Sequence, residues 1–237
     1  MAPQKRAVVI GGTSGIGLAI AERLKQSGHH VVITGVSQTG VERFEDTGRF
    51  VVQRLDVSDS AAIEHFFSCL DSVGVLVNCA GVNRRKHLEF DPDIFEDVIR
   101  VNLFGTMRAC FAAYPIMKNT GGIIINIASM FSTFGSGTIP AYASSKGAVV
   151  ALTRSLAIAW AADGIRVNAI APGFIRTKLT QDVLADQERV EEIISRTPMK
   201  RWGNPQDLSG LANFLCTEEA AFITGTTLTV DGGFSIY

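Results

Sequence analysis

Short apolar runs, rich in valine and isoleucine, recur along the chain and are separated by longer segments of helical periodicity. Most of these runs are continuously apolar rather than alternating, which is typical of strands that are buried on both faces. The candidate strands are residues 8–10, 31–34, 50–53, 75–77, 123–127, 166–170 and 227–230.

The segments between these runs carry helix signals. Leu18 and Leu24 lie on the first of them, and Gly28 is placed to end it. Further helices are predicted at about residues 59–72, 93–117, 141–162 and 206–216. Repeated strand–helix–strand order predicts an α/β fold, in which a parallel sheet carries helices on both faces. Because no linker, repeat or low-complexity segment interrupts the pattern, we predict a single domain over residues 1–237.

Composition narrows the classes of function. With 237 residues, 46% of them hydrophobic, the chain can bury one large core. The net charge of −1 predicts neither a nucleic-acid partner nor an acidic membrane surface. The four cysteines show no CxxC spacing, so we predict buried thiols in a reducing compartment and no metal site. No apolar signal region follows the polar start, and no run could span a bilayer, so we expect a soluble cytoplasmic protein.

A glycine-rich turn follows the first predicted strand and opens the first helix. Gly11, Gly15 and Gly17 have the spacing G-x3-G-x-G. Glycines let the backbone approach a pyrophosphate, which then lies at the N-terminus of a helix. A tight turn without a ligand is the alternative, and the position in the first strand-to-helix turn favours a dinucleotide site. The candidate contacts are Gly11, Thr13, Ser14, Gly15, Ile16 and Gly17.

Two further strand ends are candidates for the same ligand. Asp56 and Val57 follow the third strand and suit adenine recognition, while Asn78, Ala80 and Gly81 follow the fourth, where a ribose could lie. In open α/β sheets, ligands bind at the carboxyl ends of the strands. The alternatives are a helix cap for Asp56 and a turn-forming asparagine at position 78.

Tyr142 and Lys146 are four residues apart and therefore share one helix face. A free tyrosine titrates near ~10, and a neighbouring cation favours its phenolate. Such a pair can move a proton onto or off an alcohol oxygen, although Tyr-x3-Lys pairs are also common on solvated helix faces. Ser129 lies thirteen residues before the tyrosine.

Together these features resemble the short-chain dehydrogenase/reductase family, in the family's order and spacing. The motifs are the glycine turn, residues 78–81, Asn102, Ser129, Tyr142-x3-Lys146 and Pro172-Gly173. The resemblance implies a Rossmann fold with seven parallel strands in the order 3-2-1-4-5-6-7. Two departures are Ile10, where the family often has threonine, and Cys79, where asparagine is common.

The resemblance also implies roles for these residues. Tyr142 would be the general acid in reduction and the general base in oxidation, and Ser129 would hold the substrate oxygen. Lys146 would lower the pKa of the tyrosine and bind the nicotinamide ribose, and Tyr142 would also contact the cofactor. Asn102 would anchor a water that leads protons to solvent. The family's carboxamide-binding segment corresponds to Pro172, Gly173, Ile175 and Thr177.

The form of the cofactor is left open between NAD and NADP. No acid follows the second strand, where a carboxylate would repel the 2′-phosphate of NADP. No arginine or lysine is present at 35–38 or 12–14 to attract that phosphate, and Ser37 could bind either form. The closer family resemblance gives a slight preference for NAD.

The second half of the chain resembles the sugar-acid branch of the family, which includes 2-dehydro-3-deoxy-D-gluconate 5-dehydrogenase and gluconate 5-dehydrogenase. The matching stretches include residues 125–130 and 167–173. Arg84 or Arg85 could bind a substrate carboxylate in bidentate fashion, although a solvated basic loop is equally compatible. Met130 and Gln181 are candidate substrate contacts, and the polar segment at about 178–200 resembles the family's lid.

The helices predicted at 93–117 and 141–162 are apolar over more than one face, so part of them should be buried by another subunit. The family is usually a homotetramer built on these helices, and we expect the same here. Two alternative functions share many of these features: a 3-oxoacyl-thioester (acyl carrier protein) reductase, and a cofactor-binding regulator without catalysis. The intact set of Ser129, Tyr142 and Lys146 argues against the regulator.

Overall fold

Seven parallel strands form one sheet in the computed structural model, which describes residues 5–45 and 48–236. The strands are β1 (Arg6–Ile10), β2 (His30–Gly35), β3 (Val51–Arg54), β4 (Val75–Asn78), β5 (Gly122–Ile127), β6 (Ile165–Pro172) and β7 (Thr227–Val230). Their order is β3-β2-β1-β4-β5-β6-β7, and all neighbouring pairs are parallel. The predicted fold class and strand order are confirmed. Residues 1–4 of the polar start lie outside the described residues.

The strand order reverses between β1 and β4. These strands are neighbours, with Ile10 paired to Asn78, but the chain leaves them toward opposite edges of the sheet. Their following loops therefore separate and leave a crevice at the carboxyl ends of the strands. The predicted glycine turn and the segment from residue 79 to residue 91 both begin at this crevice.

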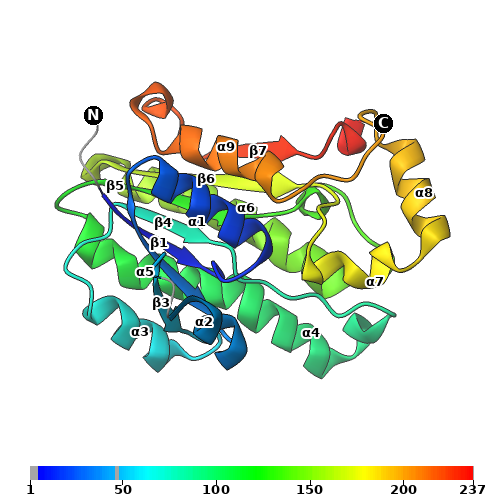
Figure 1. Cartoon of the computed structure of the whole chain (residues 1–237), viewed down its shortest axis with the longest axis horizontal. Coiled ribbons are helices and arrows are strands. Elements are labelled where there is room, and N and C mark those ends of the chain that lie inside the picture. The colour runs from blue at the N-terminus through cyan, green and yellow to red at the C-terminus, as the bar shows by residue number, and fades with distance from the viewer. Residues whose placement is uncertain (1–4, 46–47, 237) are drawn as a thin grey trace.

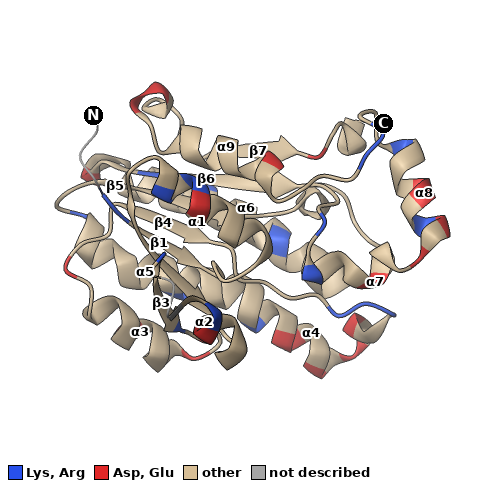
Figure 2. Ribbon diagram, viewed as in Figure 1, with Lys and Arg blue, Asp and Glu red and all other residues tan. Residues whose placement is uncertain are grey.

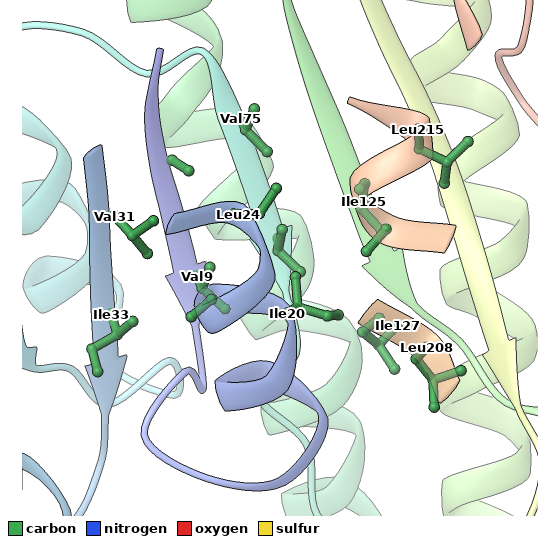
Figure 3. Packing of buried hydrophobic residues seen from close by; sticks show 14 of the residues in the cluster. Val9, Ile20, Leu24, Val31, Ile33, Val75, Ile125, Ile127, Leu208 and Leu215 are labelled. Atoms are coloured by element: carbon green, nitrogen blue, oxygen red, sulfur yellow. The ribbon is translucent and has the colours of Figure 1, made fainter. Parts of the chain in front are cut away.

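Helices cover both faces of the sheet (Figure 1). They are α1 (Gly15–Gln26), α2 (Gln38–Glu45), α3 (Ser60–Ser68), α4 (Pro92–Ile99), α5 (Gly105–Met117), α6 (Pro140–Trp160), α7 (Gln181–Leu184), α8 (Gln187–Arg196) and α9 (Gln206–Leu215). On one face Ile20 and Leu24 of α1 pack with Leu208 of α9 over the strands, as Figure 3 shows. Each such fully buried side chain contributes about 1.5–3 kcal/mol. The other face is packed by α3, α5 and α6.

A π-helical turn, Arg100–Phe104, joins α4 and α5, where the periodicity predicts a single helix over 93–117. A π turn inserts one residue into the helical ladder, and such turns are frequent at functional sites. Asn102 lies on this turn and is fully buried.

The predicted lid segment contains a 3₁₀ turn (Lys178–Thr180) followed by α7 and α8. These helices stand at one end of the molecule, and α8 carries both acidic and basic residues (Figure 2). Its acid Asp186 caps α8 by accepting a hydrogen bond from the Arg189 amide at 3.1 Å. Among the helices of the described chain, none has the length and apolar character needed to cross a membrane.

Candidate active site

Two adjoining cavities occupy the crevice at the carboxyl ends of the strands. The first has a volume of about 380 Å³ and is lined by Ser129, Tyr142 and Lys146. The second, of about 430 Å³, is lined by Asp56 and Val57. Both are lined by Gly11, Ser14, Cys79 and Gly81, so these four residues lie where the cavities meet. The structure therefore brings three of the predicted catalytic residues, Ser129, Tyr142 and Lys146, and the predicted adenine contacts to one continuous site.

The glycine turn forms the floor of this site. Gly11 has φ +75°, and a Cβ atom there would lie 2.7 Å from the Ala80 amide nitrogen. A Cβ atom on Gly17 would lie 2.3 Å from the Gly11 carbonyl oxygen, so only glycine fits at either position. Ser14 is the N-cap of α1, but its side chain caps no backbone amide. The amides of the first turn are therefore available to an anion.

Most of the other predicted cofactor contacts lie around the same two cavities. Gly15 and Ile16 line the first cavity, and Thr13 and Ala80 line the second. Across the first cavity, the end of β6 and the segment after it supply Pro172, Gly173, Ile175 and Thr177. The dinucleotide-binding residues expected from the sequence are thus placed on both sides of one cleft.

Asn78 departs from this pattern. Its side chain is buried and points into the core, where the amide nitrogen donates to Asn126 Oδ1 at 2.9 Å and to Cys110 Sγ at 3.2 Å. It lines neither cavity. The geometry therefore favours a role for Asn78 in joining β4 to β5, and gives no support to a cofactor contact from its side chain.

Short local structures position the catalytic candidates. Ser129 is the N-cap of a 3₁₀ turn, Met130–Ser132, and its hydroxyl accepts a hydrogen bond from the Phe131 amide at 3.2 Å. Tyr142 lies in the first turn of α6, which Pro140 begins. Lys146 is 4% exposed, and its Nζ donates to the Ile127 carbonyl at 2.6 Å. This Nζ lies 5.8 Å from the centroid of the Tyr142 ring.

Burial dominates the proton affinities of these groups. It raises the pKa of Tyr142, while hydrogen bonding to Ser129 and the charge of Arg85 act in the opposite direction. Burial lowers the pKa of Lys146 to about 8. The sequence led us to expect that Lys146 lowers the pKa of Tyr142, and this expectation is not met. The physical reason is that desolvation of the phenol outweighs its neighbours, and the lysine itself holds its proton weakly.

Asn102 connects the π turn to the segment that follows β4. Its Nδ2 donates to the Val82 carbonyl at 2.9 Å and to Ser145 Oγ at 3.0 Å, and its Oδ1 accepts from the Val82 amide at 2.8 Å. A Cβ atom on Gly81 would lie 3.3 Å from this Oδ1 and 3.5 Å from Lys146 Nζ. Both amide protons of Asn102 are engaged, so any water it anchors must be held by an oxygen.

The second cavity ends near the carboxyl end of β2. There Asp56 Oδ1 accepts hydrogen bonds from Ser58, and the exposed Ser37 accepts from the Gly40 amide at 3.1 Å and does not line the cavity. Two further arginines, neither of which lines the cavity, contact the backbone of residues that do. Arg43 donates to the Thr13 carbonyl at 2.5 Å, and Arg54 Nε donates to the Val36 carbonyl at 3.0 Å. Because they come from α2 and β3, no local motif could have indicated them.

The structure separates the two predicted substrate arginines. Arg84 pairs with Asp97 at 3.1 Å and lines the second cavity, whereas Arg85 lines the first. The buried Arg85 Nε has no hydrogen-bond partner among the described residues. Arg85 therefore lies in the same cavity as the catalytic candidates, where a substrate carboxylate could meet it, and Arg84 lies away from them.

The other predicted substrate contacts also separate. Met130 lines the first cavity, as expected, but Gln181 is exposed and does not. The lid segment instead contributes Lys178, Leu179 and Thr180. A second basic residue, Lys178, thus faces the cavity together with Arg85, and the sequence analysis did not select it. The one feature of the sequence that could have indicated Lys178 is its closeness to the Pro172-Gly173 motif.

One buried acid was also missed. Glu89 is 0% exposed, and its two carboxylate oxygens accept hydrogen bonds from the Arg84 amide at 2.7 Å and the Tyr142 amide at 2.8 Å. In the sequence it is one acid among several before a helix, so nothing distinguished it from a solvated residue.

Comparisons with known proteins agree with this geometry. Residues 11–235 match the family described as "Enoyl-(Acyl carrier protein) reductase". The chain is 39% identical, over 97% of its length and 95% of the relative's, to 2-dehydro-3-deoxy-D-gluconate 5-dehydrogenase of Dickeya dadantii. It is 35% identical to 5-keto-D-gluconate 5-reductase of Escherichia coli, over 98% of this chain and 96% of the relative.

A solved structure extends the comparison to the fold. The gluconate 5-dehydrogenase of Burkholderia cenocepacia, in complex with NADP and tartrate, superposes with a TM-score of 0.89 at 36% identity. That match covers 98% of this chain and 96% of the other. These full-length matches agree with the sheet order, with the glycine turn, and with the serine, tyrosine and lysine around one cavity. The chain therefore belongs to the short-chain dehydrogenase/reductase family of nicotinamide-dependent oxidoreductases.

Proposed function

We propose that this protein transfers a hydride between a nicotinamide cofactor, preferably NADP, and a secondary alcohol or ketone of a sugar acid. The observation that carries the proposal is the position of Arg85. Its half-buried guanidinium lines the same cavity as Ser129, Tyr142 and Lys146, and its Nε lacks a protein partner within the described chain. A buried N–H group without a partner is costly, and a carboxylate is the acceptor whose geometry best matches a guanidinium.

The residues present fit a dinucleotide. The free amides at the start of α1 would hold the pyrophosphate, and Asp56 and Val57 would contact the adenine. Lys146 would bind the nicotinamide ribose, while Ile175 and Thr177 would contact the carboxamide side of the ring. Once bound, the cofactor supplies or accepts the hydride.

The side chains of the first cavity supply the proton chemistry. In reduction, the Tyr142 hydroxyl donates its proton to the carbonyl oxygen of the substrate, and Ser129 hydrogen-bonds the same oxygen. The raised pKa of Tyr142 keeps the phenol protonated at neutral pH, as reduction requires. Oxidation needs the phenolate, so its rate should rise with pH. Lys146, with its pKa near 8, can return a proton to the tyrosine after reduction.

Two cations would bind the carboxylate of the substrate. Arg85 and Lys178 both line the first cavity, Arg85 from the segment after β4 and Lys178 from the segment after β6. The related gluconate 5-dehydrogenase was crystallised with tartrate, a dicarboxylate. Relatives named for 2-dehydro-3-deoxy-D-gluconate and 5-keto-D-gluconate also act on acids. A sugar acid with a keto group remote from its carboxylate is the substrate class that these features support.

The test compares an acid with its neutral analogue. We expect Arg85→Gln to lower kcat/KM for 5-keto-D-gluconate by about 10- to 100-fold, the value of a charge-assisted hydrogen bond. For L-sorbose, in which a hydroxymethyl group replaces the carboxylate, the loss should stay within about threefold. Arg84→Gln is the matched control and should affect both substrates equally and weakly, because its guanidinium pairs with Asp97. Equal losses of kcat/KM on both substrates in Arg85→Gln would contradict the proposal.

The preference for NADP revises the slight expectation of NAD. No acid is present at residues 35–38, and the guanidinium groups of Arg43 and Arg54 reach the backbone at Thr13 and Val36. These two cations favour a dianionic 2′-phosphate at this end of the site. Arg54→Gln should raise the KM for NADPH about tenfold and leave that for NADH unchanged. A parallel change for both cofactors would contradict this assignment.

We also propose that the protein assembles as a homotetramer through α5 and α6. Phe111 on α5 is 50% exposed and Ile158 on α6 is 82% exposed, and Phe111 lies against Trp160 with ring centroids 6.3 Å apart. Exposed large apolar residues on adjoining helices favour burial by a second copy. The cytoplasmic location stays a prediction from the sequence.

A further inference from the structure

A buried carboxylate joins two parts of the site that are far apart in sequence. Glu89 lies on a 3₁₀ turn, Leu88–Phe90, and is 0% exposed. One carboxylate oxygen accepts from the Arg84 amide at 2.7 Å and the other from the Tyr142 amide at 2.8 Å. A buried charge is tolerated only where hydrogen bonds replace its water, and here two backbone amides do so.

The contact with Tyr142 completes the start of α6. The N-cap residue Ile139 has no side chain that can accept a hydrogen bond, and Pro140 at the first position has no amide proton. Within the part of the chain that the structure describes, Glu89 is therefore the acceptor on which the Tyr142 amide depends. A carboxylate at this position also interacts favourably with the helix dipole. Glu89 acts as an N-terminal cap that comes from another segment of the chain.

The contact with Arg84 fixes the segment that carries Arg85. Lys86 and His87, which follow, both have φ of 60°, a left-handed conformation that is unfavourable for residues other than glycine. This strained turn brings Glu89 back against the Arg84 amide, so Arg85 is held between the hydrogen bond and the turn. The position of Arg85 in the cavity thus depends on the carboxylate.

We propose that Glu89 is a positioning residue that holds Arg85 and Tyr142 in fixed relation, so that the substrate carboxylate and the reacting oxygen are aligned together. This inference rests on the proposed function, because it assigns Tyr142 the proton transfer and Arg85 the acid group. When Glu89 is altered, the Tyr142 hydroxyl and the Arg85 guanidinium should therefore lose their fixed relative position. A misplacement of about 1 Å can cost roughly 100-fold in rate.

The charge of Glu89 gives the experiment a readout that loss of structure would not produce. Burial raises the pKa of Tyr142 most strongly; Ser129 and Arg85 lower it, Cys79 and Glu89 raise it further, and Lys146 lies over its ring. Burial lowers the pKa of Arg85, and two charges from the lid segment also act on it: Asp182 raises this pKa and Arg189 lowers it. Removal of the Glu89 charge should therefore move the pH dependence of alcohol oxidation to lower pH.

Two substitutions separate charge from geometry. Glu89→Gln removes the charge and places an amide NH₂ against one of the backbone donors. Glu89→Asp keeps the charge but is too short to span both amides. We expect kcat for oxidation of gluconate by NADP to fall at least about tenfold in both variants. The midpoint of the pH profile should shift to lower pH only in Glu89→Gln. Rates are expressed per cofactor-binding site, so unfolded protein does not count as lost activity.

Glu96→Gln is the matched control, because this exposed acid lines the same surface hollow as Glu89 and accepts no hydrogen bond from residues 5–45 or 48–236. It should leave kcat and the pH midpoint unchanged. Wild-type kcat in both Glu89 variants, or an unmoved midpoint in Glu89→Gln, would overturn the inference. Tyr142→Phe, assayed in parallel, separates the two levels: if it retains turnover, the proposed function itself fails, whereas an inactive Tyr142→Phe with active Glu89 variants removes only the role of Glu89.

Discussion

At the scale of single residues, four buried or half-buried ionisable side chains lie close together at the first cavity. Glu89 and Lys146 are almost fully buried, Tyr142 and Arg85 are half-buried, and all four surround one cavity or its wall. Desolvation is the main cause of the shifted pKa values of Lys146, Tyr142 and Arg85. Strong desolvation at a cluster of titratable groups in a cleft is characteristic of active sites.

The lysine provides a test that needs no substrate. The pKa of Lys146 is lowered from 10.5 to about 8 in the folded protein. Below pH 8 the ammonium is charged in both the folded and unfolded states, so the folded state carries the full desolvation cost. As the pH rises from 8 to 10.5, the folded protein loses this proton first and the cost disappears. Its full size is at most about 3 kcal/mol.

Lys146→Met should therefore gain stability relative to the wild type at low pH and lose that advantage as the pH rises. The loss of the hydrogen bond to the Ile127 carbonyl offsets part of the gain. Thermal unfolding of both proteins between about pH 6 and pH 10 checks this difference. The same substitution at the exposed Lys118 is the control and should give a difference that does not vary with pH. A flat difference for Lys146 as well would contradict the assigned desolvation.

At the scale of elements, apolar periodicity in the sequence predicted the strands but not the irregular turns. The strands were predictable because continuous valine and isoleucine runs indicate burial on both faces. The π turn at Arg100–Phe104 was not, because a single inserted residue leaves the apolar spacing around Val98 and Ala109 almost unchanged. The same limit applies to Arg84 and Arg85: adjacent residues in an irregular segment have no periodicity that could assign them to different cavities.

The π turn matters because it aims Asn102 at the segment after β4. In Asn102→Asp, the donor Nδ2 is replaced by an oxygen that would face the Val82 carbonyl. We expect a loss of about 1–3 kcal/mol in unfolding free energy, together with reduced kcat, because Gly81 lies next to both Asn102 and Lys146. Urea unfolding and steady-state kinetics measure the two effects. The exposed Asn119→Asp is a control of identical chemistry, and equal stability of the two variants would count against this role.

At the scale of the whole molecule, the order of the strands decides where the chemistry lies. It brings the loops after β1 and β4, the turn after β5 and the segment after β6 to one cleft. The strand order could be predicted from the family resemblance, and so could the gathering of Ser129, Tyr142 and Lys146 around one cavity. The contributions of Arg43, Arg54, Glu89 and Lys178 could not, because each depends on contact between segments that are distant in sequence.

The proposed tetramer is a property of the whole molecule. We expect light scattering at micromolar concentration to give the mass of four chains, each of 25.4 kDa. Ile158→Glu should reduce that mass, because a charge would be buried where an apolar side chain is now 82% exposed on the single chain. Val51→Glu, on the edge strand β3, is the control and should leave the tetramer intact. A wild-type monomer under these conditions would contradict the assembly.

The central claim is that Tyr142 transfers the proton while the cofactor site operates independently of it. The most direct measurement is Tyr142→Phe, assayed for NADPH binding by fluorescence and for reduction of 5-keto-D-gluconate by nicotinamide absorbance. Because phenylalanine keeps the ring and removes only the hydroxyl, we predict an NADPH dissociation constant within about twofold of wild type and a loss of turnover of at least about 100-fold. Turnover comparable to that of the wild-type protein would contradict the mechanism.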